Sequence, residues 1–160
     1  MTEAVDGRLA EVTADTLEKL AFLFATPMDA SPAIDETQLT TVRVEFGGAF
    51  AGGVELSLSG PVLDELAVNM LGADDGEPIA PEARLDALKE LANVVCGNLL
   101  PILGGGEAVF NIEAPVVVPA DRPAWARCAA SCGLALDQGI CRVRLRLEPG
   151  AAGARPSAAR

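Results

Sequence analysis

Two runs of alternating apolar and polar residues, 40–48 and 52–60, constrain the fold of this 160-residue chain more than any other feature of its sequence. The runs read TTVRVEFGG and GGVELSLSG, and a short segment with small residues joins them. Because successive side chains of a strand point to opposite faces, this alternation indicates strands with one apolar face. Two such runs around a short glycine-containing turn predict a β-hairpin.

A helix is expected before the hairpin, in the stretch GRLAEVTADTLEKLAFLFATP. Its apolar residues recur at helical spacing, and Pro27 provides a stop signal. The positions expected to face the core are Leu9, Val12, Leu17, Leu20 and Phe24. A loop rich in proline and aspartate should then lead to about residue 36.

Two helices and further strands are expected after the hairpin. The short helix 60–72 has Pro61 near its start and Gly72 at its end, where helices favour these residues. An acidic loop follows, and then a long helix over about 81–102. The remaining strand candidates are 108–119, 124–137 and 139–148.

Length and composition fit one compact domain with a substantial core, since half of the residues are hydrophobic. We expect an N-terminal tail at 1–8, a folded domain at 9–148 and a flexible, proline-containing tail at 149–160. No run of about 18 apolar residues occurs, and the N-terminus lacks the basic-then-apolar order of a secretory signal. The sequence therefore predicts a cytoplasmic protein.

The charge is strongly negative and unevenly distributed. The formal net charge is −11, and residues 1–100 contain eighteen of the 23 acidic side chains. Nucleic acids and anionic membranes require positive surfaces, so neither is an expected partner. A basic protein partner fits this charge, although an acidic surface also serves solubility alone.

The chain has four cysteines and no histidine. Without a secretion signal, Cys96, Cys128, Cys132 and Cys141 are expected to be small buried hydrophobic residues and not two disulfides. The spacing Cys-x3-Cys without histidine is a weak zinc signal, so no metal site is expected. Catalytic pairs that need histidine are excluded, which leaves carboxylates, amides or groups of a partner.

The last strand candidate carries an arginine ladder, defined as Arg142, Arg144 and Arg146, which alternates with apolar residues. Charges of this kind commonly lie on a solvated sheet face or edge. The alternative is that they pair with acidic groups of another subunit or of the N-terminal half.

The long helix carries polar residues at an unusual spacing. With about 100° of rotation per residue, Asp86, Glu90, Asn93 and Gly97 fall within about 60° of one another. We call these four residues the polar stripe. The opposite, core-facing positions are Leu88, Leu91, Ala92, Val95, Leu99 and Ile102. Gly97 costs helix stability, and close approach of another molecule is one reason to retain it. The alternative is an ordinary surface with an Asp86–Lys89 pair.

This stretch resembles the signature of the CheC/CheX family of chemotaxis phosphatases, (Asp/Ser)-x3-Glu-x2-Asn on a long exposed helix. The motif falls on Asp86, Glu90 and Asn93, and NVVCGN is similar to the Asn-x3-Gly-Asn continuation of the CheX branch. The preceding NMLGADDGEP and the order of elements extend the resemblance to about Glu148. It implies an α+β fold, a pseudo-twofold repeat with long helices packed on a mostly antiparallel sheet.

The resemblance implies a phosphatase for the aspartyl phosphate of a CheY-like response regulator. Asn93 would position the attacking water, and Glu90 would hold a lysine of the regulator. Asp86 and Gly97 would add partner contacts. No cofactor is expected on this chain, because the Mg²⁺ of the reaction would be bound by the regulator. A homodimer is implied as well.

The alternative to catalysis is a noncatalytic module of the same fold, which binds a regulator or a flagellar-switch-type partner. Asn93 separates the two hypotheses, because docking alone has no need for a water-positioning amide. Some family members carry the motif on both long helices. Here the first helix places Asp15, Lys19 and Phe22 at the matching positions, which favours the one-site CheX arrangement.

Overall fold

The computed structural model describes residues 2–28, 35–74, 76–119, 125 and 128–148. The helices are α1 (Thr2–Ala21), α2 (Gly60–Leu71) and α3 (Pro81–Gly104), with a 3₁₀ turn at Glu36–Gln38. The strands are β1 (Thr26–Pro27), β2 (Leu39–Gly48), β3 (Gly52–Ser59), β4 (Phe110–Ile112), β5 (Val116–Val118), β6 (Ala130–Leu136) and β7 (Gly139–Leu147). The predicted hairpin is β2 and β3, and the two later helices lie where the sequence placed them.

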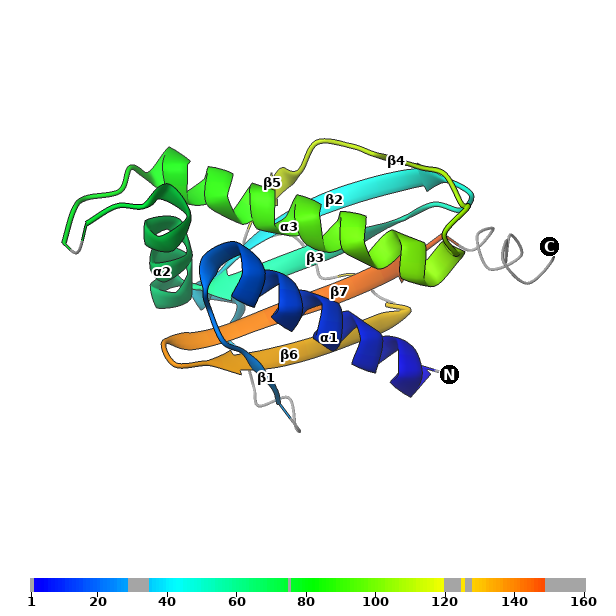
Figure 1. Cartoon of the computed structure of the whole chain (residues 1–160), viewed down its shortest axis with the longest axis horizontal. Coiled ribbons are helices and arrows are strands. Elements are labelled where there is room, and N and C mark those ends of the chain that lie inside the picture. Colours follow the sequence, from blue (N-terminus) through cyan, green and yellow to red (C-terminus); the bar gives the residue numbers. More distant parts are fainter. Residues whose placement is uncertain (1, 29–34, 75, 120–124, 126–127, 149–160) are drawn as a thin grey trace.

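The strands form one antiparallel sheet in the order β1-β6-β7-β3-β2-β4, and β5 also pairs with β2. Figure 1 shows α1 and α3 crossing the same face of this sheet, with α2 at one end. The expected α+β architecture, long helices packed on a mostly antiparallel sheet, is confirmed. None of the helices in the described residues is long and apolar enough to cross a membrane.

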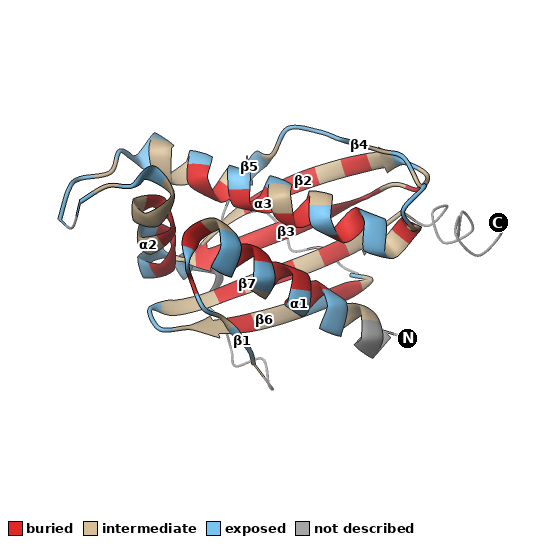
Figure 2. Ribbon diagram, in the orientation of Figure 1, coloured by how far each residue is buried: buried red, intermediate tan, exposed pale blue. Residues whose placement is uncertain are grey.

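The core lies between the helices and the alternating apolar residues of the central strands. Val44 pairs with Val54, which pairs in turn with Leu145, and all three are fully buried. Leu17 of α1 and Leu91 of α3 are also fully buried in this layer. Figure 2 shows the buried positions of α1 and α3 on the sides that meet the sheet. This packing supplies the burial that holds the long helices in place.

The first helix is longer at its start than the sequence predicted. It begins at Thr2, so residues 2–8 belong to α1 and the expected N-terminal tail is wrong for them. The Ser131 amide donates to Asp6 Oδ1 at 2.9 Å, which links this first part of the helix to strand β6. A carboxylate thus satisfies a backbone donor on the sheet edge.

Helix α1 ends at Ala21, before the predicted stop at Pro27. Phe22 adopts a left-handed backbone with φ of 57°, and its amide donates to the Glu18 carbonyl at 2.9 Å. Phe24 is 70% exposed, so its prediction as a core residue is wrong. The physical reason is the turn at Phe22, which breaks the helical register of the residues that follow.

The later strands differ in extent from their predictions. The segment 108–119 forms two short strands, β4 and β5, and the segment 124–137 contributes only β6. Strand β1 was not predicted, since two residues leave no alternation to read. The predicted C-terminal tail, 149–160, lies outside the described residues.

The sheet face opposite the helices carries buried charges. Arg43 Nε donates to Glu55 Oε2 at 2.9 Å, and both residues are less than 9% exposed. Arg146 Nη2 donates to Glu45 Oε1 at 2.7 Å. The Trp125 ring lies 4.8 Å from Arg43 Cζ and 5.0 Å from Arg146 Cζ, within cation–π range. For Arg146, the alternative interpretation of the arginine ladder, pairing with acidic groups of the N-terminal half, is therefore the one that the structure shows.

Candidate functional site

Helix α3 positions the candidate site through its apolar side. Pro81 occupies the first turn, where its missing amide hydrogen costs nothing, and Gly105 caps the end. The predicted core positions Leu88, Leu91, Ala92, Val95 and Leu99 are all fully buried. Ile102 is 39% exposed, so its prediction as a core residue is wrong. It borders the groove between α1 and α3 and therefore stays near the surface.

The polar stripe lies on the outer side of α3, as the helical spacing predicts. Asp86, Glu90 and Asn93 are exposed, and Gly97 is half-buried. Glu90 and Asn93 are three residues apart, so they are neighbours on the helix surface. An acid and an amide are thus presented together to solvent from one rigid element.

Two contacts fix α3 against the other helices. Arg84 Nη1 donates to Asp64 Oδ1, which joins α3 to α2 near the start of the polar stripe. Asn98 Nδ2 donates to Thr16 Oγ1 at 3.3 Å and joins α3 to α1 beyond its end. The sequence did not indicate the Asn98 contact, because no pattern within one helix reveals which residue of another helix faces it.

The polar stripe makes no ion pair or hydrogen bond through its side chains within the described part of the chain. In particular, the alternative pairing of Asp86 with Lys89 is not formed there. The carboxylates and the Asn93 amide therefore keep their full hydrogen-bonding capacity for another molecule. Gly97 also has open space beside it, since a Cβ built on it would have no atom within 4 Å apart from its chain neighbours and the adjacent backbone of α3.

The cysteines offer no nucleophile to this site. Cys96 lies one turn from Asn93, but its side chain is fully buried in the core, and burial raises the pKa of its thiol to about 12. The thiol is therefore protonated at neutral pH. All four cysteines are free. Cys96 and Cys141 are buried as predicted, whereas Cys128 is exposed, so its prediction as a buried residue is wrong. The described residues contain no cluster of acidic or cysteine side chains that could hold a metal ion.

The first helix does not reproduce the polar stripe. Asp15 and Lys19 form an exposed ion pair of 2.9 Å along the helix. Phe22, at the position that matches Asn93, lies beyond the end of α1. A second site with the same groups is therefore missing from α1.

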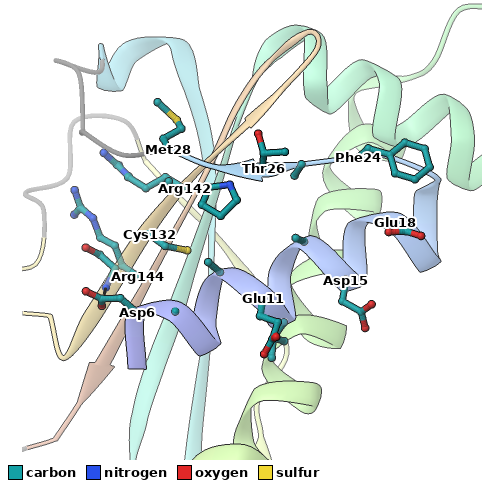
Figure 3. A pocket seen from close by; sticks show the side chains of 18 of the residues that line it. Asp6, Glu11, Asp15, Glu18, Phe24, Thr26, Met28, Cys132, Arg142 and Arg144 are labelled. Carbon is teal, nitrogen blue, oxygen red and sulfur yellow. Dashed lines mark hydrogen bonds between the residues drawn. The ribbon is translucent and has the colours of Figure 1, made fainter. Parts of the chain in front are cut away.

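The polar stripe lines neither of two hollows that the described residues form beside α1. A hollow of about 1320 Å³ runs along α1, β1 and β6, and none of the stripe residues lines it. Figure 3 shows Glu11 and Asp15 on the outer side of α1, whereas Arg142 and Arg144 point away from them. These charged groups do not converge on a common point. The candidate site is thus an exposed helix surface suited to a macromolecular partner.

Solved structures define the class of fold. CheX from Desulfovibrio desulfuricans gives a TM-score of 0.70 at 17% identity, covering 91% of this chain and 99% of that chain. CheX from Vibrio vulnificus gives a TM-score of 0.70 at 20% identity, covering 91% of this chain and 99% of that chain. A chain of the CheX–CheY–BeF3–Mg complex from Borrelia burgdorferi gives 0.63 at 14% identity, with coverages of 89% and 96%. The fold is that of CheX-like chemotaxis proteins.

The family follows from the sequence. The family described as chemotaxis phosphatase CheX matches residues 40–137, which is more than half of the chain. No curated protein matches the sequence. The chain belongs to the CheX family, as its motif helix indicated.

Proposed function

We propose that this chain is a phosphatase that removes the phosphoryl group from the aspartate of a CheY-like receiver domain. The observation that carries the proposal is the joint exposure of Glu90 and Asn93, one helical turn apart on a helix anchored by its buried side. The family and the CheX–CheY complex of the Borrelia relative support a receiver domain as the partner. The proposed site of action is the cytoplasm.

The proposed reaction is an in-line displacement at phosphorus. Water attacks the phosphorus atom, the bond from phosphorus to the aspartate oxygen breaks, and the aspartate leaves as a carboxylate with release of inorganic phosphate. The Asn93 amide has both a donor and an acceptor, so it can orient the water without adding charge beside the phosphoryl group. Catalysis then rests on positioning, for which a fixed helix is suited.

The acidic residues of the stripe serve docking in this proposal. Glu90 accepts a charge-assisted hydrogen bond from a lysine of the receiver's active site and so sets the docked register. Asp86, one turn earlier, makes a second contact. The Mg²⁺ that neutralises the phosphoryl group is bound by the receiver, so the reaction needs no cofactor on this chain.

The test is phosphate loss from a panel of phosphorylated CheY-like receiver domains, with and without this chain. We expect faster loss from at least one receiver. Receiver binding with no faster loss from any panel member would favour the noncatalytic module.

Gly97→Ala should separate folding from docking. A methyl group meets nothing within the chain, and alanine should raise the free energy of unfolding by up to about 1 kcal/mol. The same methyl group would stand between α3 and a receiver that approaches closely. Urea denaturation and receiver binding by titration calorimetry measure the two effects. Unchanged receiver affinity in the more stable variant would show that the partner does not contact Gly97.

We also propose that the chain forms a homodimer through the sheet edge at β5. Val116 and Val117 are 52% and 41% exposed there, and an apolar sheet edge favours pairing with another chain. Val117→Lys should convert the dimer to a monomer, because it places two charges at a twofold contact. Light scattering would measure the mass. A wild-type monomer at every concentration would contradict the dimer.

A further inference from the structure

Three large apolar side chains are exposed near the C-terminal ends of α1 and α2. Phe22, Phe24 and Leu71 are 73%, 70% and 56% exposed, and we call them the apolar corner. The Asn69 amide donates to the Ala21 carbonyl at 2.7 Å, so the ends of α1 and α2 are in contact. Phe22 and Leu71 are thus brought to the same region of the surface.

Phe22 is unfavourable for the isolated fold in two ways. It occupies the left-handed position directly after a helix, where glycine is favoured and a side chain is strained. It also leaves most of an aromatic ring in water. The neighbouring residue Leu23, not Phe22, is buried in the core. Strain at an exposed residue outside the core points to a function outside the chain.

The end of α1 lies level with the polar stripe of α3. Helices α1 and α3 run in opposite directions across the sheet (Figure 1). Asn98 contacts Thr16, and Leu20 and Val94 line the same groove between the two helices. Because the two helices are antiparallel, Ala21 at the end of α1 lies at about the level of Asn93, and Phe22 follows it directly. One partner seated on the polar stripe can therefore also reach the apolar corner.

We propose that the apolar corner is a second contact surface for the receiver domain, one that takes an apolar patch beside the phosphorylated aspartate. This inference rests on the proposed function. The polar stripe orients the active site of the receiver, and the aromatic rings of Phe22 and Phe24 supply the buried area that carboxylates cannot. Aromatic residues dominate the energetics of such contacts. A second copy of this chain is the less favoured occupant, because the corner belongs to the helix layer, where the end of α1 lies level with the polar stripe.

Phe22→Gly tests this surface with opposite effects on folding and binding. Glycine removes the ring and relieves the left-handed strain, so the Tm should be unchanged or higher. The Kd for a receiver carrying BeF3⁻ and Mg²⁺ should rise about tenfold or more. In turnover experiments the loss should appear mainly in KM. Val109→Ser is the matched control, since Val109 is 76% exposed beyond the end of α3 and its loss should not change the Kd.

The outcomes separate this inference from the proposed function. Equal Kd values for wild type and Phe22→Gly, with a receiver that the wild type dephosphorylates, would show that the apolar corner does not contact the receiver. The proposed function would stand. Failure of the wild type to bind any receiver would overturn the proposed function and this inference together. If Phe22→Gly lowers self-association and leaves receiver binding unchanged, the corner serves a second copy and the inference is wrong. A weaker Kd with an unchanged or higher Tm supports it.

Discussion

Asn93→Ala should slow receiver dephosphorylation by about 10² to 10⁴-fold while leaving receiver affinity nearly unchanged. This is the range typical of a positioned catalytic group, and the reason is that alanine can neither donate to nor accept from the attacking water. Asn93 is exposed on α3, so its truncation should leave no cavity and no buried unpaired group. Single-turnover phosphate release and binding calorimetry measure the two quantities.

The matched control is Glu18→Ala on α1, the helix that lacks the amide. Glu18 is exposed, and its loss should change neither rate nor affinity. Equal dephosphorylation rates for wild type and Asn93→Ala, with both proteins folded, would remove the amide from the mechanism.

Glu90→Lys should abolish receiver binding at concentrations where the wild type is saturated. Glu90→Ala removes one charge-assisted hydrogen bond, which costs about 1.5–3 kcal/mol, or roughly a tenfold to 150-fold weaker Kd. The reversal to lysine costs more, because it places two positive charges in contact. Calorimetric titration of both variants with one receiver shows which substitution weakens receiver binding more.

Glu107→Lys provides the control for net charge, since this exposed glutamate follows the end of α3. It makes the same change in charge away from the polar stripe and should bind normally. If Glu107→Lys weakens binding as much as Glu90→Lys, the effect is long-range electrostatics and the proposed lysine contact is wrong.

The candidate site was predictable because one helix contains all of it. The spacing of Asp86, Glu90 and Asn93 determines their common face, and the opposite apolar spacing determines which face is buried. The structure confirms that arrangement. The β2–β3 hairpin was predictable for a similar reason, since alternation is a local property of each strand.

Features that depend on contacts between distant segments were not predictable. Residues 2–8 are helical in a fold that links Asp6 to the Ser131 amide, and no local pattern reveals that partner. Phe24 fits the helical spacing of α1, but the left-handed turn at Phe22 removes it from the helix face. The apolar corner was not predictable either, because large apolar residues in a sequence usually indicate positions in the core.

Multiple-turnover phosphate release from a phosphorylated CheY-like receiver tests the central claim most directly. The receiver is held in excess over this chain, and inorganic phosphate is followed continuously. A catalyst should release several equivalents of phosphate per chain at a rate well above that of the receiver alone, and Asn93→Ala should return the rate close to that baseline. Phosphate release at the rate of the receiver alone, under conditions where calorimetry shows the complex to form, would contradict the phosphatase and identify the chain as a binding module.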